Sequence, residues 1–193
     1  MQKKINIVLL GDSTVGKYTV IRRYSSGTYI DEYDPYLEEC FDLKVKIDNK
    51  EIPFHGILVA CQDDFASMWP YNVRKGDGFI LMYSIDDEIS FNEVLKFHEL
   101  IKKIKGDTHV PIVLCGNKCD LQKQRKVSKA QGDELARKIG AKFFESSALE
   151  GINIQEMFET IVGMVINGCE MDGNNIKNEN NTETKRHEVC FIS

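Results

Sequence analysis

The sequence predicts an α/β protein with a six-stranded, mostly parallel sheet, one antiparallel edge strand and helices on both faces. Apolar runs of strand length alternate with segments whose apolar residues recur at helical spacing, a pattern typical of parallel strands joined by right-handed crossovers. Two neighbouring runs are instead joined by the short turn Asp48-Asn49-Lys50. Such a turn indicates a hairpin, and therefore one antiparallel strand.

The first half of the chain contains three expected strands and one expected helix. The apolar run 5–10 is a buried strand, and the helix that follows continues to about Ser26, just before a glycine. Residues 40–47 alternate apolar and polar side chains, as a strand with one buried face does. The return strand of the hairpin is expected at 52–60.

The second half continues the alternation. Strands are expected at the apolar runs 79–85, 110–115 and 141–145. Helices are expected where the spacing changes to the helical period, and these segments are 86–104, 128–140 and 154–165. Ser128 and Gln131 have the spacing of a capping box, and Asn153 is expected to cap the last helix.

Composition restricts the function classes. The chain has 193 residues, enough for one domain and a tail, and a net charge of −5, which argues against a general nucleic-acid binder. No apolar run approaches the 18 or so residues of a membrane-spanning helix, and no secretory signal is recognisable. The six cysteines are irregularly spaced, so a disulfide framework is not expected.

A glycine-bounded loop between the first strand and the first helix predicts a phosphate site. Its sequence is Gly11-Asp12-Ser13-Thr14-Val15-Gly16-Lys17-Tyr18. Backbone N–H groups of such a loop surround phosphate oxygens, and the lysine reaches the β- and γ-phosphates. Tyr18 stands where this motif has serine or threonine, whose hydroxyl binds Mg²⁺, and a phenol cannot place its oxygen there. We expect the phosphate contacts to remain and one metal ligand to be lost.

A second polar segment, Asn117-Lys118-Cys119-Asp120, follows the strand at 110–115. The carboxylate of Asp120 can accept hydrogen bonds from the ring N–H and the exocyclic amine of guanine. Adenine lacks both donors on that edge, so the segment predicts a guanine site. Ser146-Ser147-Ala148, after the strand at 141–145, would supply a third loop, with the Ala148 N–H near the guanine oxygen.

With these motifs the chain resembles Ras-family small GTPases from about residue 3 to 165. The resemblance implies the P-loop small G-protein fold, GTP and GDP as ligands, and Tyr29 as an aromatic neighbour of guanine. It also implies that Gln62 positions water for hydrolysis. The implied effector loop, which would bind effector and regulator proteins, consists of Tyr33, Asp34, Pro35, Tyr36, Leu37, Glu38, Glu39, Cys40 and Phe41.

The metal site departs from the family pattern at several positions. The family has a Thr in the first switch and Asp-x-x-Gly in the second, where this chain has Tyr36, Leu58 and Cys61. Together with Tyr18, these changes leave no protein ligand for Mg²⁺ that we can assign. We expect Mg²⁺, if it binds, to be held mainly by phosphate oxygens and water. The sequence therefore predicts weak or absent GTP hydrolysis.

The C-terminal segment predicts a lipid anchor. We expect a nucleotide-binding domain at 1–167, a disordered tail at 168–189 and a C-a-a-X prenylation box at 190–193, with Cys190 carrying a farnesyl group. The segment from 168 onward has three basic and five acidic residues, so it contains no polybasic second signal. We expect a monomer on the cytoplasmic face of the cell membrane, with a cytosolic fraction.

Three interpretations remain open at this point. The protein could be an ordinary GTPase that cycles between GTP and GDP forms. It could instead bind nucleotide with little hydrolysis, or scarcely bind it, and act as an interaction protein. A third class is an unrelated P-loop phosphotransferase, against which Asp120 and the C-a-a-X box argue. The losses at Tyr18, Tyr36 and Leu58 favour the second interpretation.

Overall fold

The six strands form a single sheet in a computed structural model that describes residues 4–29, 40–59, 69–106 and 109–168. The strand order is β2-β3-β1-β4-β5-β6. Among the strands of these segments, only β2 and β3 pair antiparallel, at the edge of the sheet, as the hairpin predicted. The strands are β1 (Ile5–Gly11), β2 (Cys40–Ile47), β3 (Lys50–Leu58), β4 (Gly78–Ser84), β5 (Ile112–Asn117) and β6 (Lys142–Glu145).

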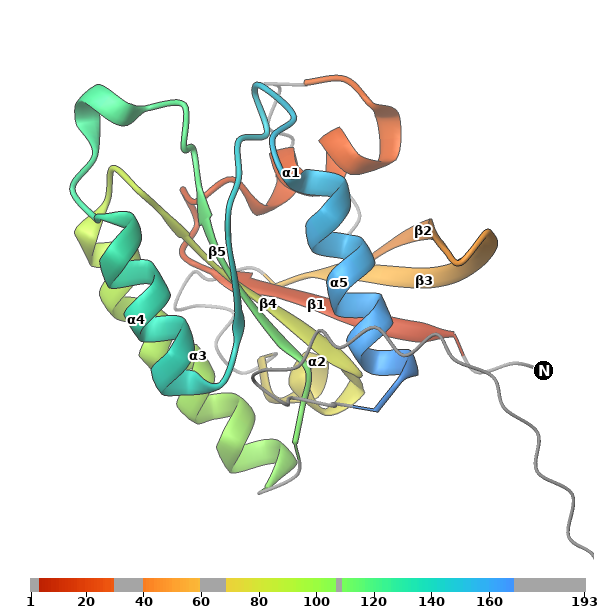
Figure 1. The fold of residues 1–193 in the computed structure, drawn as a ribbon. Coiled ribbons are helices and arrows are strands. Elements are labelled where there is room, and N and C mark those ends of the chain that lie inside the picture. The colour runs from red at the N-terminus through yellow and green to blue at the C-terminus, as the bar shows by residue number, and fades with distance from the viewer. Residues whose placement is uncertain (1–3, 30–39, 60–68, 107–108, 169–193) are drawn as a thin grey trace, which may run out of the picture.

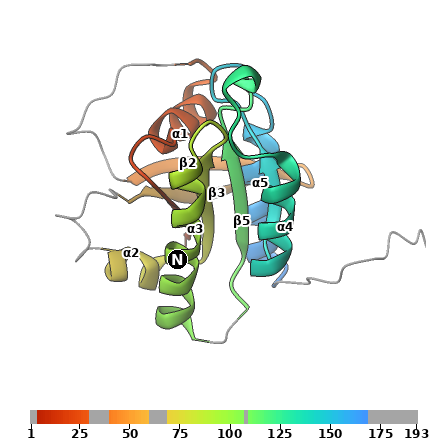
Figure 2. The ribbon, with the colours of Figure 1, turned by 90° about the vertical axis from the view of Figure 1, so that its left-hand side faces the viewer.

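Helices cover both faces of the sheet (Figures 1 and 2). Residues of α1 and α5 share one buried cluster with one face, while residues of α2, α3 and α4 share a second cluster with the other. The helices are α1 (Lys17–Ser26), α2 (Trp69–Lys75), α3 (Glu88–Lys105), α4 (Lys129–Ile139) and α5 (Ile154–Ile166), with a short 3-10 helix at Gln122–Gln124. No helix in these described segments is long and apolar enough to cross a membrane.

The central strands carry apolar side chains on both faces, which is why they read as continuous apolar runs. All seven residues of β4 and all six of β5 are buried. β2, at the edge, buries only alternate residues, and apart from Cys40 its exposed positions are charged. This arrangement places the carboxyl ends of β1, β5 and β6 at one edge of the sheet, where ligands of such folds bind.

One expected cap is wrong. α4 begins with the predicted capping box, in which the Ser128 side chain accepts from the Gln131 backbone. Asn153 does occupy the N-cap position of α5, but its side chain does not cap the helix. Its backbone is left-handed, with φ 55°, and its amide donates instead to the carbonyl of Glu145 at 2.7 Å. The side chain therefore ties α5 to the end of β6.

Candidate nucleotide site

Two glycines of the phosphate loop are required by close neighbours. Gly11 has φ 151°, and a Cβ there would collide with the backbone carbonyl of Met82 on β4. Gly16 has φ 87°, and a Cβ would lie 2.7 Å from the side-chain amide nitrogen of Asn117. The loop can therefore follow this path only with glycine at both positions. The sequence motif has its two glycines at these same positions.

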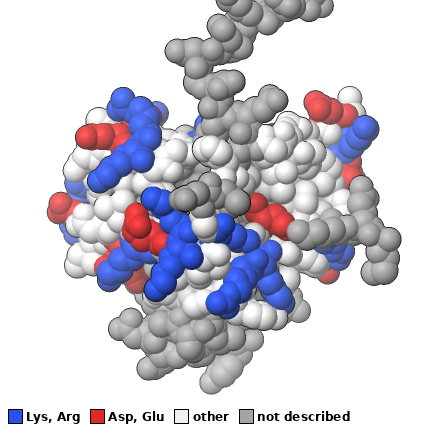
Figure 3. Space-filling view, turned by 90° about the horizontal axis from the view of Figure 1, so that it is seen from below, with Lys and Arg blue, Asp and Glu red and all other residues white. Residues whose placement is uncertain are grey.

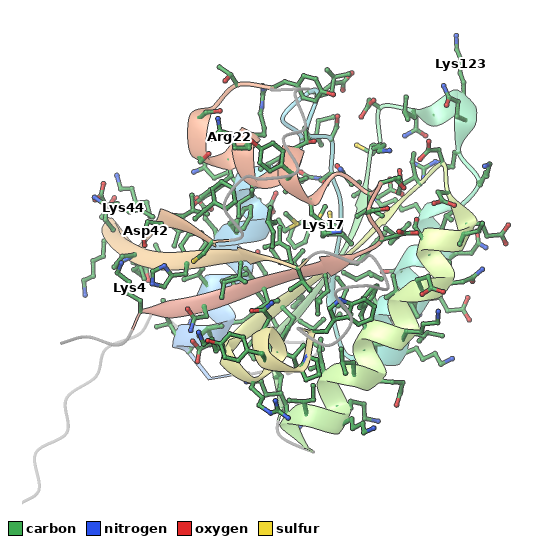
Figure 4. The ribbon with its side chains drawn as sticks, turned by 180° about the vertical axis from the view of Figure 1, so that it is seen from behind. Lys4, Lys17, Arg22, Asp42, Lys44 and Lys123 are labelled. Atoms are coloured by element: carbon green, nitrogen blue, oxygen red, sulfur yellow. The ribbon has the colours of Figure 1, made fainter. Side chains whose placement is uncertain are left out.

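Lys17 is buried beneath the loop at the start of α1, in the middle of the molecule in Figure 4. Its Nζ donates to the carbonyl of Gly11 and to that of Asp12, each at 2.7 Å. Gly16 occupies the N-cap position of α1 and, having no side chain, does not cap the helix. A buried ammonium and an uncapped helix N-terminus together favour an anionic ligand here.

Asn117 connects the phosphate loop to the guanine segment. Its side-chain amide donates to the carbonyl of Val15 at 2.9 Å, and its carbonyl oxygen accepts from the Ser146 hydroxyl at 3.0 Å. Asn117 is 1% exposed, so both contacts are shielded from water. One side chain thus fixes three loops relative to each other.

The carboxylate of Asp120 is oriented by Ser147. The Ser147 hydroxyl donates to Asp120 Oδ1 at 2.5 Å and accepts from the Glu150 backbone N–H at 3.1 Å. Lys118, the first residue after β5, has a left-handed backbone with φ 62°, which turns the segment sharply toward Asp120. The predicted guanine-reading carboxylate is therefore held in place by a residue of the predicted third loop.

These segments enclose a cavity of about 390 Å³. Seven of the residues that line it were predicted to contact nucleotide, namely Thr14, Gly16, Tyr29, Asn117, Lys118, Asp120 and Ala148. Three further lining residues were not predicted as site residues, namely Thr19, Leu121 and Leu149. Each is a close sequence neighbour of a motif residue, which is the only signal that could have identified them. The structure brings the phosphate and guanine motifs to one cavity, as nucleotide binding requires.

A half-buried ion pair that the sequence motifs did not predict connects the guanine segment to the loop after β6. Arg125 forms two hydrogen bonds to Glu145, at 2.6 and 3.0 Å, and donates to the carbonyl of Val127 at 3.0 Å. The Glu145 carboxylate raises the pKa of the Arg125 guanidinium. Because Glu145 ends β6 and Arg125 follows the guanine segment, the pair holds the second and third loops together.

The residues present do not fit a magnesium site of the family type. The Tyr18 ring packs against the buried cluster on one face of the sheet, and its centroid lies 6.3 Å from that of Phe41. The Arg22 guanidinium lies 5.9 Å from the centroid of the Tyr18 ring. Leu58 packs against the same cluster. Among the described residues no group of three His, Cys, Asp or Glu could hold a metal ion.

Several predicted residues lie outside the described segments. They are Gln62, Cys61, Cys190 and residues 30–39, which include Tyr36 and most of the expected effector loop. Of that loop, Cys40 is exposed at the start of β2, whereas Phe41 is buried against Tyr18. The Phe41 side chain therefore serves packing and is not offered to a partner.

Comparison with known proteins identifies the family. The Ras family model matches residues 6–167. The Ras-like protein rasS of Dictyostelium discoideum is 37% identical over 188 residues, covering 96% of this chain and 97% of the relative. Ras-like protein 2 of Mucor circinelloides is 37% identical over 160 residues, covering 83% and 81%. Ras-like protein 1 of Saccharomyces cerevisiae is 34% identical over 163 residues, covering 84% and 53%. The chain is a member of the Ras family of small GTPases, and this membership implies that it binds GTP and GDP.

Proposed function

We propose that the protein is a guanine-nucleotide-binding signalling protein with weak or absent intrinsic hydrolysis. The observation that carries this proposal is the position of Tyr18. The residue that should supply a metal-binding hydroxyl is packed against Phe41 and the core. The groups that would hold phosphate and guanine, in contrast, are assembled around one cavity.

The retained contacts favour a protein that binds guanine nucleotide over an interaction protein that scarcely binds it. Lys17 stays buried, and Asn117 joins the phosphate loop to the guanine loops through two hydrogen bonds. A buried lysine and a buried asparagine are costly unless they serve structure or a ligand. Here Asn117 lines a cavity of about 390 Å³, a volume within the range of small-molecule sites, and Lys17 directly follows Gly16, which also lines it.

The losses around the metal support slow hydrolysis. Loss of one group around a metal typically costs 10- to 100-fold in metal affinity or activity. In this chain Tyr18 and Leu58 both pack against the core cluster instead of presenting a metal-binding group. A reaction that depends on Mg²⁺ in the family should therefore be strongly impaired here.

Nucleotide affinity with and without metal tests the proposal. We would release any bound nucleotide and measure the dissociation constants of GDP and GTP in millimolar Mg²⁺ and in EDTA. We expect the two conditions to agree within about tenfold, because the protein contributes few metal ligands. Tyr18→Phe is the matched control, since it keeps the ring and removes the hydroxyl, and it should behave as the wild type does.

Two results would contradict weak metal dependence. Tight binding that collapses in EDTA, or a Tyr18→Phe variant that loses affinity only in Mg²⁺, would show a rebuilt metal site and an ordinary GTPase cycle. Single-turnover phosphate release gives a second readout. We expect a rate at least about tenfold below the intrinsic Ras rate of roughly 4 × 10⁻⁴ s⁻¹.

We also propose farnesylation of Cys190 and residence on the cytoplasmic face of the cell membrane with a cytosolic fraction. The C-a-a-X sequence at 190–193 supports this, and terminal serine favours farnesyl. Effector and regulator proteins would bind the acidic segment 33–41, which attracts basic partner surfaces. Mass spectrometry of the protein from its own cells would test the modification, and an unmodified Cys190 would refute it.

A further inference from the structure

A cluster of cations lies at the opposite end of the molecule from the nucleotide site. α2 ends with Arg74 and Lys75, and the last turn of α3 carries Lys102, Lys103 and Lys105. We call these five residues the basic corner. Figure 3 views this end of the molecule and shows Lys and Arg side chains gathered near the middle of the face.

The basic corner is built by contacts between the two helix ends. Lys105 Nζ donates to the carbonyl of Arg74 at 2.9 Å and to that of Gly76 at 2.6 Å. The Lys75 ammonium lies 4.2 Å from the centroid of the Tyr71 ring. Lys105 thus joins the end of α3 to the end of α2, and the other four cations belong to these two joined helix ends.

These four cations, Arg74, Lys75, Lys102 and Lys103, are exposed. Within the described part of the chain, none of them forms an ion pair with a carboxylate. Of the acidic residues close in sequence within the described segments, Asp77 accepts the Asn6 backbone N–H at 2.9 Å, and Glu99 lies one turn earlier on α3, so the four cations outnumber them. The surface therefore keeps a positive potential that attracts a negatively charged partner.

The helix dipole accounts for lysines at each helix end, but it does not account for the two basic ends lying together. Lysine in the last turn of a helix is favourable because it complements the helix dipole. That effect acts on each helix separately and falls off within one turn. It gives no reason for two such ends to be fastened side by side, which concentrates like charges and costs repulsion.

The exit of the C-terminal segment adds the second observation. Val165, in the last turn of α5, lies 2.9 Å from the place that a Cβ on Gly78 would occupy. Gly78 follows Gly76, whose carbonyl accepts from Lys105, by two residues. The chain beyond Gly168, which ends in Cys-Phe-Ile-Ser, therefore departs close to the basic corner.

We propose that the basic corner docks on the anionic phospholipid headgroups of a membrane and acts beside the prenyl group on Cys190. The inference rests on the proposed lipidation. One lipid chain gives marginal, reversible binding, and stable anchoring takes a second signal, which the segment beyond 168 lacks with three basic and five acidic residues. Each Lys or Arg near such a surface strengthens binding by about fivefold.

Vesicle sedimentation of the full-length, farnesylated chain tests the proposal. The vesicles contain phosphatidylcholine alone or mixed with phosphatidylserine. We compare the wild type with Lys75→Gln/Lys102→Gln/Lys103→Gln. On phosphatidylserine the triple variant should bind on the order of a hundredfold more weakly, from three factors of about fivefold. On phosphatidylcholine alone, the two proteins should bind equally.

The matched control removes the same charge from the other end of the molecule, where Lys123, Lys126 and Lys129 are also exposed. Figure 4 labels Lys123 at that end. The variant Lys123→Gln/Lys126→Gln/Lys129→Gln should stay within about twofold of the wild type, because charges far from the membrane are screened. Equal binding of both triple variants to phosphatidylserine vesicles would overturn the proposal.

A second measurement separates this proposal from the lipidation on which it rests. A hexahistidine tag after Ser193 holds the unmodified chain on nickel-chelating lipid, and lysine acylation is read by mass spectrometry. Lys102 and Lys103 should be protected when phosphatidylserine is present, whether or not Cys190 accepts a farnesyl group. Equal acylation on both vesicle types would overturn membrane docking by these lysines.

Discussion

At the scale of single residues, hydrogen bonds between loops organise the nucleotide site. The sequence indicates that Asp120 reads guanine, but it does not indicate what orients the carboxylate. The structure shows that the Ser147 hydroxyl, 27 positions further along the chain, donates to it at 2.5 Å. Asn117 likewise uses its amide on the carbonyl of Val15 in the phosphate loop. Long-range partners of this kind cannot be read from local spacing.

Ser147→Ala should weaken guanine-nucleotide binding about tenfold, because a hydrogen bond to a charged carboxylate contributes at least ~1.5 kcal/mol. Fluorescent GDP titration measures the change. Ser25→Ala, an exposed serine of α1 whose hydroxyl donates to the carbonyl of Arg22, is the control and should leave the affinity unchanged. A Ser147→Ala variant that folds and binds GDP as tightly as the wild type would contradict the assigned role.

His98 should make the protein less stable as the pH falls. Its side chain is only 13% exposed, and desolvation by burial lowers its pKa from the ordinary 6.5, with Lys102 acting in the same direction and Glu99 opposing. The unfolded chain therefore takes up the proton first as the pH drops below about 6.5, and the free energy of unfolding decreases. Above that pH the effect is absent.

Urea unfolding of the wild type and His98→Gln between about pH 7.5 and 5.5 measures this linkage. The wild type should lose more stability on acidification than the variant does. Parallel pH profiles for the two proteins would show that His98 does not carry the effect.

At the scale of elements, local sequence signals located the six strands and four of the longer helices, but not all of their ends, and they did not predict α2 at Trp69–Lys75. Strand β5 was expected at 110–115 and is observed at Ile112–Asn117. The extension contains Gly116 and Asn117, which pair with Tyr83 and Ser84 of β4 through the backbone. Backbone pairing does not require apolar side chains, so an apolar run cannot show where it stops.

The two expected caps illustrate the same limit. Ser128 forms its capping box because both partners lie within one turn of the chain. Asn153 instead donates to Glu145, an acceptor that only the folded loop brings within 2.7 Å. Sequence pattern therefore predicts caps whose hydrogen-bond partners lie within one turn, and it misses contacts with partners that only the fold brings close.

Ser128→Ala should lower the free energy of unfolding by about 1 kcal/mol, since the N-terminal N–H groups of α4 lose their side-chain acceptor. For a domain of this size the thermal midpoint should fall by about 2–4 °C. Differential scanning calorimetry measures it. Lys129→Ala, the next residue of the same helix, controls for substitution at this end and should shift the midpoint far less.

At the scale of the whole molecule, the nucleotide cavity lies between loops that belong to different parts of the sheet. The phosphate loop follows β1, whereas the guanine loops follow β5 and β6. The alternation of strands and helices predicted that these loops share one edge of the sheet. It did not predict the strand order, which depends on how the two apolar faces are covered.

Because a bound nucleotide contacts loops from both parts, it should stabilise the entire domain. At a GDP concentration 100 times its dissociation constant, the gain is about 2.7 kcal/mol, which raises the thermal midpoint by roughly 5–10 °C. The shift should be similar in Mg²⁺ and in EDTA. ADP should give no shift, and an equal shift with ADP would contradict the guanine assignment.

The contact between Tyr18 and Phe41 also bears on the history of the chain. A serine in place of Tyr18 would leave a hole beside Phe41 and cost on the order of 2 kcal/mol, while Leu58 would still contribute no carboxylate. A lineage returning toward the common family pattern one substitution at a time would first become less stable without recovering a metal. Packing has thus made the change difficult to reverse, and descendants of this protein should keep an aromatic residue at position 18.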